Sequence, residues 1–206
     1  MSKIIFNLGV KMLSKLTSYF LMITCLAAVS ACTPAKFRYR IDPEITQAQS
    51  LAAKAQTIAV QVTDLRSNNY PTQNNKITLI SGPVDEAAQL KAQIIDNLTR
   101  SQFRIISNPL LADLNVELQI ETLQAAVNQS MLKSTIKVDS HIRLIASKQG
   151  NKIEKLFRTT REQDVANPVK ELDVTGVVNQ LLSQQLTSIF NEPALLNLAA
   201  TASEYD

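Results

Sequence analysis

The side chain with the clearest chemistry in this sequence is the thiol of Cys32, which follows Val29, Ser30 and Ala31 at the end of an apolar run. Small residues leading to a cysteine are the pattern that bacterial signal peptidase II cleaves, directly before the cysteine. The sulfur then takes a diacylglycerol, and the new amino group usually takes a further acyl chain such as palmitate. We therefore expect residues 1–31 to be a lipoprotein signal peptide and Cys32 to become the lipidated first residue.

The apolar run over residues 16–31 has the charge order of a secretory signal. It contains no charged residue and follows three lysines, which is the order of a basic region, an apolar region and a cleavage site. A membrane-spanning helix needs roughly 20 apolar residues, so this shorter run is predicted to be removed. Translation from Met1 and translation from Met12 both fit this pattern.

Processing changes the charge and the thiol content of the chain. All 21 basic residues except the three signal lysines follow Cys32, so 18 basic residues face 18 acidic ones. Such a balance gives no electrostatic argument for nucleic-acid binding. Cys25 leaves with the signal, so no disulfide is expected.

Thr33 stands where an Asp would signal inner-membrane retention, which favours the outer membrane, facing the periplasm.

Two other parts of the sequence are candidate sites. Asp64 and Arg66 come two residues apart at the end of a predicted strand, so they should point the same way and could bind a polar ligand. A turn closed by hydrogen bonds is the commoner use of such an Asp. His141 is the single histidine, too few nitrogen ligands for zinc. Its neighbour Ser140 should face the other side of the strand, so Asp139, Ser140 and His141 form no triad.

We accordingly predict no catalytic residue, no metal site and no cofactor, and expect that the protein is not an enzyme. The few glycines after Cys32 are far apart, so no phosphate-binding loop is expected. Gly176, inside a predicted helix, suggests close packing against the sheet.

The stretch 32–56 is predicted to be a lipidated tether. Phe37, Tyr39 and Ile41 alternate with arginines, which indicates an extended segment. It could lie along a sheet edge, the preferred interpretation, or Phe37 and Tyr39 could rest at the membrane interface.

Residues 57–191 are predicted to form one periplasmic domain, followed by a C-terminal tail over 192–206. Strict alternation of apolar and polar residues marks the strands, and apolar stripes mark two helices. The predicted strands cover about 57–63, 76–80, 104–106, 114–127, 136–144 and 153–162, and the helices about 82–102 and 171–190.

The apolar positions change phase near Glu121 or Thr122, which predicts a β-bulge. Gly150 and Asn151 predict the turn between the last two strands. Lys155 and Arg161, or their neighbours, are assigned to the polar face of the sheet. The fold class is α+β: a two-layer, mostly antiparallel sheet, in the order β-α-β, three-strand meander, α, with two helices on one face.

The chain resembles the YajG-like family of bacterial lipoproteins. The resemblance rests on the lipidation motif, the Val62-Thr-Asp64-Leu-Arg66 element, the meander with its Gly150 turn and the closing helix. It implies an association with the outer membrane or cell wall, since the family's genes often lie near a muropeptide permease gene, and it implies no activity.

These observations favour a membrane-anchored, non-enzymatic module that binds an envelope protein or peptidoglycan. A lipid or small-ligand carrier, with a groove between helices and sheet, is the alternative. A cell-wall hydrolase is a third class and would need clustered carboxylates or a nucleophile in a cleft.

The lipidation hypothesis predicts that Cys32→Ser blocks both acylation and cleavage, because the peptidase acts on the acylated cysteine. Mass spectrometry of the protein from membranes should show full-length, unlipidated precursor. A processed and membrane-bound Cys32→Ser product would contradict it.

Overall fold

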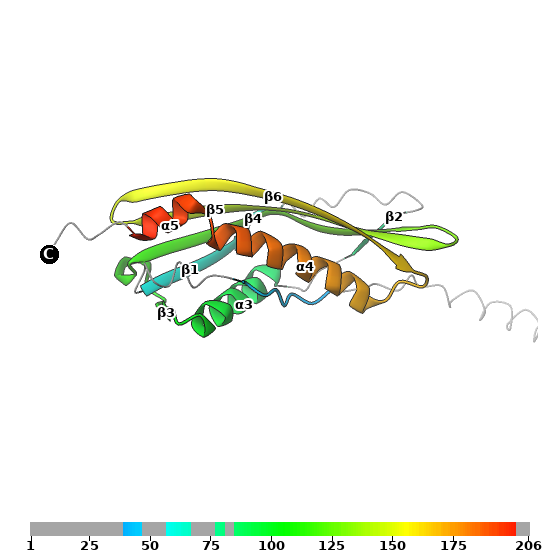
Figure 1. Cartoon of the computed structure of the whole chain (residues 1–206), viewed down its shortest axis with the longest axis horizontal. Coiled ribbons are helices and arrows are strands. Elements are labelled where there is room, and N and C mark those ends of the chain that lie inside the picture. The colour runs from blue at the N-terminus through cyan, green and yellow to red at the C-terminus, as the bar shows by residue number, and fades with distance from the viewer. Residues whose placement is uncertain (1–38, 47–56, 67–76, 81–84, 201–206) are drawn as a thin grey trace, which may run out of the picture. The chain divides into compact units, whose positions relative to one another are not determined.

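The computed structural model describes residues 39–46, 57–66, 77–80 and 85–200. In this part of the chain, helices lie on one face of a twisted sheet (Figure 1). The predicted α+β class, with a mostly antiparallel sheet, is confirmed. Cys32 and most of the predicted tether lie outside the described residues.

The sheet has six strands in the order β3-β1-β4-β5-β6, with β2 pairing the far part of β4. The strands are β1 (Thr57–Asp64), β2 (Ile77–Ile80), β3 (Arg104–Ile105), β4 (Leu114–Gln129), β5 (Lys133–Lys148) and β6 (Asn151–Ala166). β1 is parallel to β3 and β4, and all other pairs are antiparallel. Parallel neighbours need a crossover connection, which helix α3 (Glu86–Arg100) provides between β1 and β4.

The long meander of β4, β5 and β6 is the main part of the sheet. Along β4 and β5 every second side chain is buried, as the alternation predicted. The register shifts between Ile120 and Thr122, which confirms the predicted bulge. Gln149 and Gly150 both have positive φ, 49° and 84°, and form the two-residue turn whose twist suits a hairpin.

On β6 the polar face carries the neighbours Glu154 and Glu162, and the assignment of Lys155 and Arg161 themselves to this face is wrong. Lys155 lies opposite Leu144 and Arg161 opposite Val138, both of which are buried beneath the helices. β6 is an edge strand, so a long cationic side chain can lie over apolar neighbours and still bring its charge to the border. Lys155 Nζ does so by donating to Glu192 Oε2 at 2.7 Å.

The helices cover the apolar face of the meander. Helix α4 (Glu171–Phe190) buries the predicted stripe, and α5 (Pro193–Ala200) buries Leu195 and Ala199 completely. The core therefore continues past residue 191, the predicted end of the domain. Gly176 does not pack against the sheet: it is exposed, and a Cβ there would meet no atom within 4 Å. No described helix is long and apolar enough to cross a membrane.

A buried polar contact fixes α4 on the sheet. Ser140 Oγ donates to Gln185 Oε1 at 2.7 Å, and Gln185 Nε2 donates to the carbonyl oxygen of Phe157 at 3.0 Å. Both Ser140 and Gln185 are almost fully buried. Because an unpaired buried amide is costly, this contact favours one position of the helix along β5 and β6.

Residues 39–46 form an extended segment that lies between α3 and α4 (Figure 1). Tyr39, Ile41, Pro43 and Ile45 are buried, whereas the residues between them are exposed. The extended conformation was predicted correctly, but the preferred place at a sheet edge and the membrane-interface position of Tyr39 were both wrong. The segment packs on helices instead. The hydrophobic core therefore begins before residue 57, the predicted start of the domain.

Helix α4 binds the backbone of this segment with a row of short polar side chains four residues apart. The N–H groups of the exposed residues donate in turn to this row: Arg40 to Thr175 Oγ1 (3.3 Å), Asp42 to Asn179 Oδ1 (2.8 Å), Glu44 to Ser183 Oγ (2.9 Å) and Thr46 to Thr187 Oγ1 (3.1 Å). Four helical residues rise about 6 Å, and two extended residues about 6.6 Å. The two repeats therefore stay in step over four contacts.

Substitution of Asn179 is the most direct test of this row of hydrogen bonds, because Asn179 also donates from Nδ2 to the carbonyl oxygen of Arg40 at 3.0 Å. Asn179→Ala removes both hydrogen bonds and should lower the free energy of unfolding by about 1–2 kcal/mol, measured by urea denaturation. Gln180→Ala, at an exposed position on the same helix, is the control and should change little. Equal stability of the two variants would show that the row contributes nothing.

Candidate functional site

Asp64 and Arg66, the residues predicted as a candidate binding pair, bind each other. Arg66 Nε donates to Asp64 Oδ1 at 2.9 Å and Nη2 to Asp64 Oδ2 at 2.6 Å, so both carboxylate oxygens are used. The backbone N–H of Arg66 also donates to Asp64 Oδ1, at 3.0 Å. The hydrogen bonds from Arg66 hold the pKa of Asp64 below its usual range. This is the turn-closing arrangement that the sequence favoured.

The guanidinium continues inward to a buried carboxylate. Arg66 Nη1 bonds to Glu86 Oε2 and donates to the carbonyl oxygen of Leu123 at 3.2 Å. Glu86, in the first turn of α3, is 4% exposed, and its Oε1 accepts from the hydroxyl of Tyr39 at 2.8 Å. Burial raises the pKa of Glu86, and the charge of Arg66 partly offsets this effect.

This chain of contacts, from Asp64 through Arg66 and Glu86 to Tyr39, joins the end of β1, the start of α3, β4 and the extended segment. We call it the Arg66 cluster. Its donors and acceptors face one another, so its geometry is that of a structural link between elements. Neither Glu86 nor Tyr39 was predicted as a site residue, because an acidic residue in the first turn of a helix is ordinarily explained by the helix dipole.

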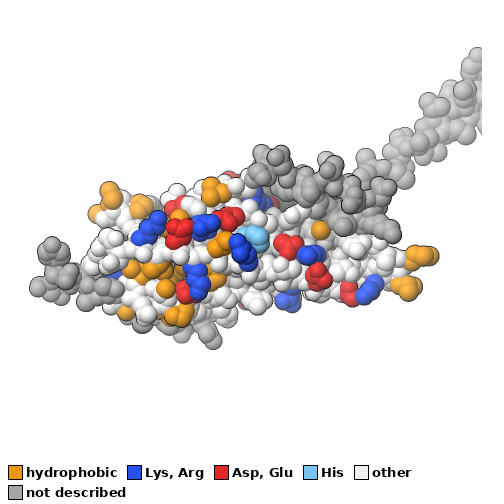
Figure 2. All heavy atoms as spheres, turned by 90° about the horizontal axis from the view of Figure 1, so that it is seen from above, with side chains coloured by type: hydrophobic (Ala, Val, Ile, Leu, Met, Phe, Trp, Pro, Cys, Tyr) orange, Lys and Arg blue, Asp and Glu red, His pale blue; other side chains and the backbone are white. Residues whose placement is uncertain are grey.

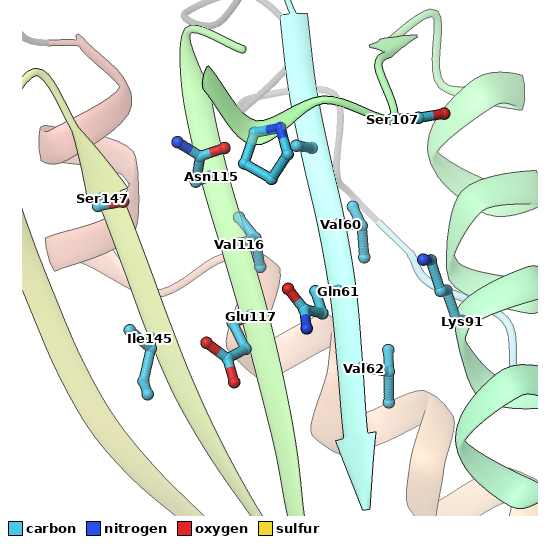
Figure 3. Close-up of a pocket in the computed structure, with 12 residues that line it drawn as sticks. Val60, Gln61, Val62, Lys91, Ser107, Asn115, Val116, Glu117, Ile145 and Ser147 are labelled. Carbon is cyan, nitrogen blue, oxygen red and sulfur yellow. The ribbon is translucent and has the colours of Figure 1, made fainter. Parts of the chain in front are cut away.

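A groove of about 420 Å³ lies elsewhere, on the polar face of the sheet near the start of β4. Its floor consists of two rows of cross-strand neighbours from β1, β4 and β5: Ala59, Asn115 and Ser147 in one row, and Gln61, Glu117 and Ile145 in the other. Ser107, which is labelled in Figure 3, and Pro109 also line the groove. None of these residues was predicted as a site.

The groove reaches the outer edge of β1, where Val60, Val62 and Lys91 of α3 also line it. In Figure 3 the side chain of Lys91 extends from α3 towards this strand. Ile58 accepts from the N–H of Ile106 on the outer side at 3.0 Å, whereas Leu65 donates towards β4 at 2.9 Å. Strand residues direct their backbone groups alternately to the two sides, so Val60 and Val62 present theirs outward. Among the described strands none pairs with β1 there.

One acceptor in the groove has no partner among the described residues. Asn115 Oδ1 is buried, and no described residue donates a hydrogen bond to it. Buried polar atoms are rarely left unpaired in proteins, so this oxygen is available to a donor from a bound molecule.

The remaining candidate residues show no catalytic arrangement. Figure 2 shows charged side chains and the histidine spread over the polar face of the sheet, with acidic and basic groups interspersed. His141 lies on this face, and Ser140 beneath it on the helix side, as predicted. Within the described residues no group of three or more His, Cys, Asp or Glu could hold a metal ion.

The sequence matches the model of a family described as uncharacterized lipoproteins, over residues 43–198. The chain belongs to this lipoprotein family. The match agrees with the resemblance to YajG-like lipoproteins and indicates a membrane-anchored location in the bacterial envelope. No curated protein matches the sequence.

Three solved structures are similar to this lipoprotein. Protein XCC0632 of Xanthomonas campestris has a TM-score of 0.45 and 12% identity, covering 78% of this chain and 95% of its own. Lipoprotein GNA1162 of Neisseria meningitidis has a TM-score of 0.34 and 11% identity, covering 66% and 99%. Rare lipoprotein B of Shewanella oneidensis has a TM-score of 0.35 and 10% identity, covering 68% and 91%.

The Arg66 cluster predicts a pH-dependent loss of stability in Arg66→Met. Removing the guanidinium leaves Glu86 buried and unpaired, which should lower the free energy of unfolding of the lipoprotein by about 3 kcal/mol at pH 7. A raised carboxyl pKa favours folding at low pH and opposes it as the pH rises through that pKa. A lowered pKa, as in Asp64, does the reverse. Both effects make the deficit of Arg66→Met shrink as the pH falls.

Urea denaturation between pH 7 and pH 4 would measure this deficit. Adding Glu86→Gln to Arg66→Met should restore part of the stability at pH 7, because the unpaired charge is then gone. Arg100→Met is the control, since the pair of Arg100 with Asp96 on α3 is exposed and such pairs stabilise little. A deficit that does not depend on pH would contradict the role of Glu86.

Proposed function

We propose that this lipoprotein is a non-enzymatic binding module on the periplasmic face of the outer membrane, anchored by lipid on Cys32. Its binding site is the groove at β1, and its ligand is an extended segment of another envelope protein. The observation that carries the proposal is the outer edge of β1 along this groove, where Val60 and Val62 present backbone groups and no described strand pairs with them.

An extended polypeptide fits this edge because it can add a strand to the sheet. Strand addition gives affinity through main-chain hydrogen bonds, and alternate side chains enter pockets on either face. Here one set of side chains would lie over Gln61 and Glu117 on the floor of the groove, and the other near Lys91. An amide donor from the same segment could also satisfy Asn115 Oδ1.

The carrier alternative has less support. A carrier would need an apolar space between the helices and the sheet. The groove between α3 and α4 is occupied by the chain itself, through Tyr39, Ile41, Pro43 and Ile45. The groove at β1 has a mixed lining that includes Lys91 and Glu117, which suits a polar backbone better than a lipid tail.

The hydrolase alternative lacks its catalytic pair. Glycoside cleavage needs two carboxyl groups across the bond that breaks. The groove lining has one carboxylate, Glu117, which accepts from Gln119 Nε2 at 2.8 Å. Three described acids have shifted pKa values: Asp64 and Glu86 are bound in the Arg66 cluster, and Asp164 pairs with Lys133.

Site-specific photo-crosslinking in cells tests this proposal. A crosslinking residue at Gln61, exposed in the groove, should capture one reproducible envelope protein. The same residue at Gln180, exposed on α4, should not. A peptidoglycan adduct from Gln61, or equal adducts from both positions, would contradict recognition of a protein segment.

The variant Val62→Pro tests whether the ligand binds by adding a strand to β1 or by other contacts. It removes an outward N–H and leaves the backbone bonds between β1 and β4 in place, so the Gln61 adduct should disappear, whereas Val62→Thr should retain it. Lys91→Glu, on α3, provides a second test in case Val62→Pro unfolds. Persistence of the adduct in both folded variants would rule out the edge as the site.

A further inference from the structure

The end of the β4–β5 hairpin exposes two adjacent large apolar side chains. Met131 is 98% exposed and Leu132 is 92% exposed, although the strands on either side are well packed. Leu172, in the first turn of α4, is 79% exposed. Figure 2 shows hydrophobic side chains protruding at an end of the domain. We call Met131, Leu132 and Leu172 the apolar tip.

Contacts in the structure connect the apolar tip to the N-terminal segment. Asn167 Nδ2 donates to the carbonyl oxygen of Ser130 at 2.8 Å, and Ser134 Oγ donates to Asn167 Oδ1 at 2.5 Å, which joins the hairpin to the start of α4. Arg40 binds the first turns of α4 through Thr175. The hairpin end and the start of α4 lie at the same end of the sheet (Figure 1).

The length of the chain decides which end of the domain can reach the membrane. Seven residues separate Cys32 from Tyr39, and fully extended they span at most about 25 Å. The hydroxyl of Tyr39 lies near Leu123, through Glu86 and Arg66. From Leu123 to the hairpin end at Gln129 is about 20 Å along β4, which is within the reach of the anchor.

When the sheet stands upright on the membrane, its opposite end is out of reach. From Leu123 back to Leu114, the start of β4, is about 30 Å, and Leu110 lies beyond it. Leu110 is also strongly exposed, at 91%. In an orientation with the long axis of the sheet upright on the membrane, a lipid on Cys32 therefore permits the apolar tip, but not Leu110, to touch the bilayer.

We propose that the apolar tip sits in the membrane surface beside the lipid anchor, with Met131 and Leu132 among the acyl chains. This inference rests on the lipidation of Cys32 that the proposed function includes. Two lysines lie near the tip, and acidic residues balance both of them. Lys133 pairs with Asp164 at 2.5 Å. Lys170 is followed in the sequence by Glu171 and Asp173. The tip thus has no excess positive charge, and the partner it fits is a zwitterionic phospholipid surface.

Depth-dependent fluorescence quenching of the lipidated full-length mature protein tests this inference. Removal of Cys25 and acylation of Cys32 leave an introduced cysteine as the one free thiol. Met131→Cys carries an environment-sensitive dye, and the protein is reconstituted into phosphatidylcholine vesicles containing lipids spin-labelled in the acyl chain. We expect a blue-shifted emission and strong quenching of this dye.

Leu110→Cys with the same dye is the matched control and should show neither change. Absence of quenching at residue 131, or equal quenching at 131 and 110, would overturn the inference. The vesicles contain no other protein, so quenching at residue 131 reports contact with lipid alone. Protein that fails to float with the vesicles would instead contradict the anchor, and flotation without quenching at residue 131 would overturn the apolar tip alone.

Discussion

The match in repeat distance between an extended chain and helix α4 is the constraint on which the rest of this structure depends. Every second N–H of residues 40–46 meets a short polar side chain on every fourth residue of α4. The alternate side chains then fill the space between α3 and α4, and Tyr39 enters the Arg66 cluster. The end of the tether is thereby part of the folded domain, and only seven residues separate Tyr39 from the proposed anchor at Cys32.

The orientation proposed above would give the two ends of the domain different environments. With the apolar tip at the bilayer, the groove at β1 lies about 40 Å further out, counted along β4 from Gln129 to Glu117. The open edge of β1 then faces the periplasm at a distance from the headgroups, where a segment of another envelope protein can approach it. The polar face of the sheet, with its interspersed charges, remains solvated beside it.

Much of the fold could be predicted from the sequence because it depends on local patterns. The alternation in β4 and β5, the bulge at Glu121 and the stripe of α4 follow from which residues must be buried. The place of Tyr39 could not be predicted in this way, since alternation shows that a segment is extended but not what it packs on. The four-residue spacing of Thr175, Asn179, Ser183 and Thr187 is visible in the sequence. This spacing could have indicated that the helix binds an extended backbone.

The candidate site was predictable only in part. The pairing of Asp64 with Arg66 follows from their spacing, whereas Glu86 is brought to them by the crossover helix. The groove at β1 combines rows from three strands, and such rows depend on register, which the sequence does not show. Lys155 and Arg161 were misplaced because an edge strand tolerates cations on its apolar side.

Amide hydrogen exchange of the mature domain, followed residue by residue by NMR, tests most directly whether residues 39–46 are part of the fold. The N–H groups of Arg40, Asp42, Glu44 and Thr46 donate to side chains of α4 and, among the described residues, to no strand of the sheet, so their protection depends on α4. Protection of these amides close to that of β5 is the expected result. Exchange at the rate of an unstructured peptide, while α4 itself stays protected, would show that the segment does not complete the domain.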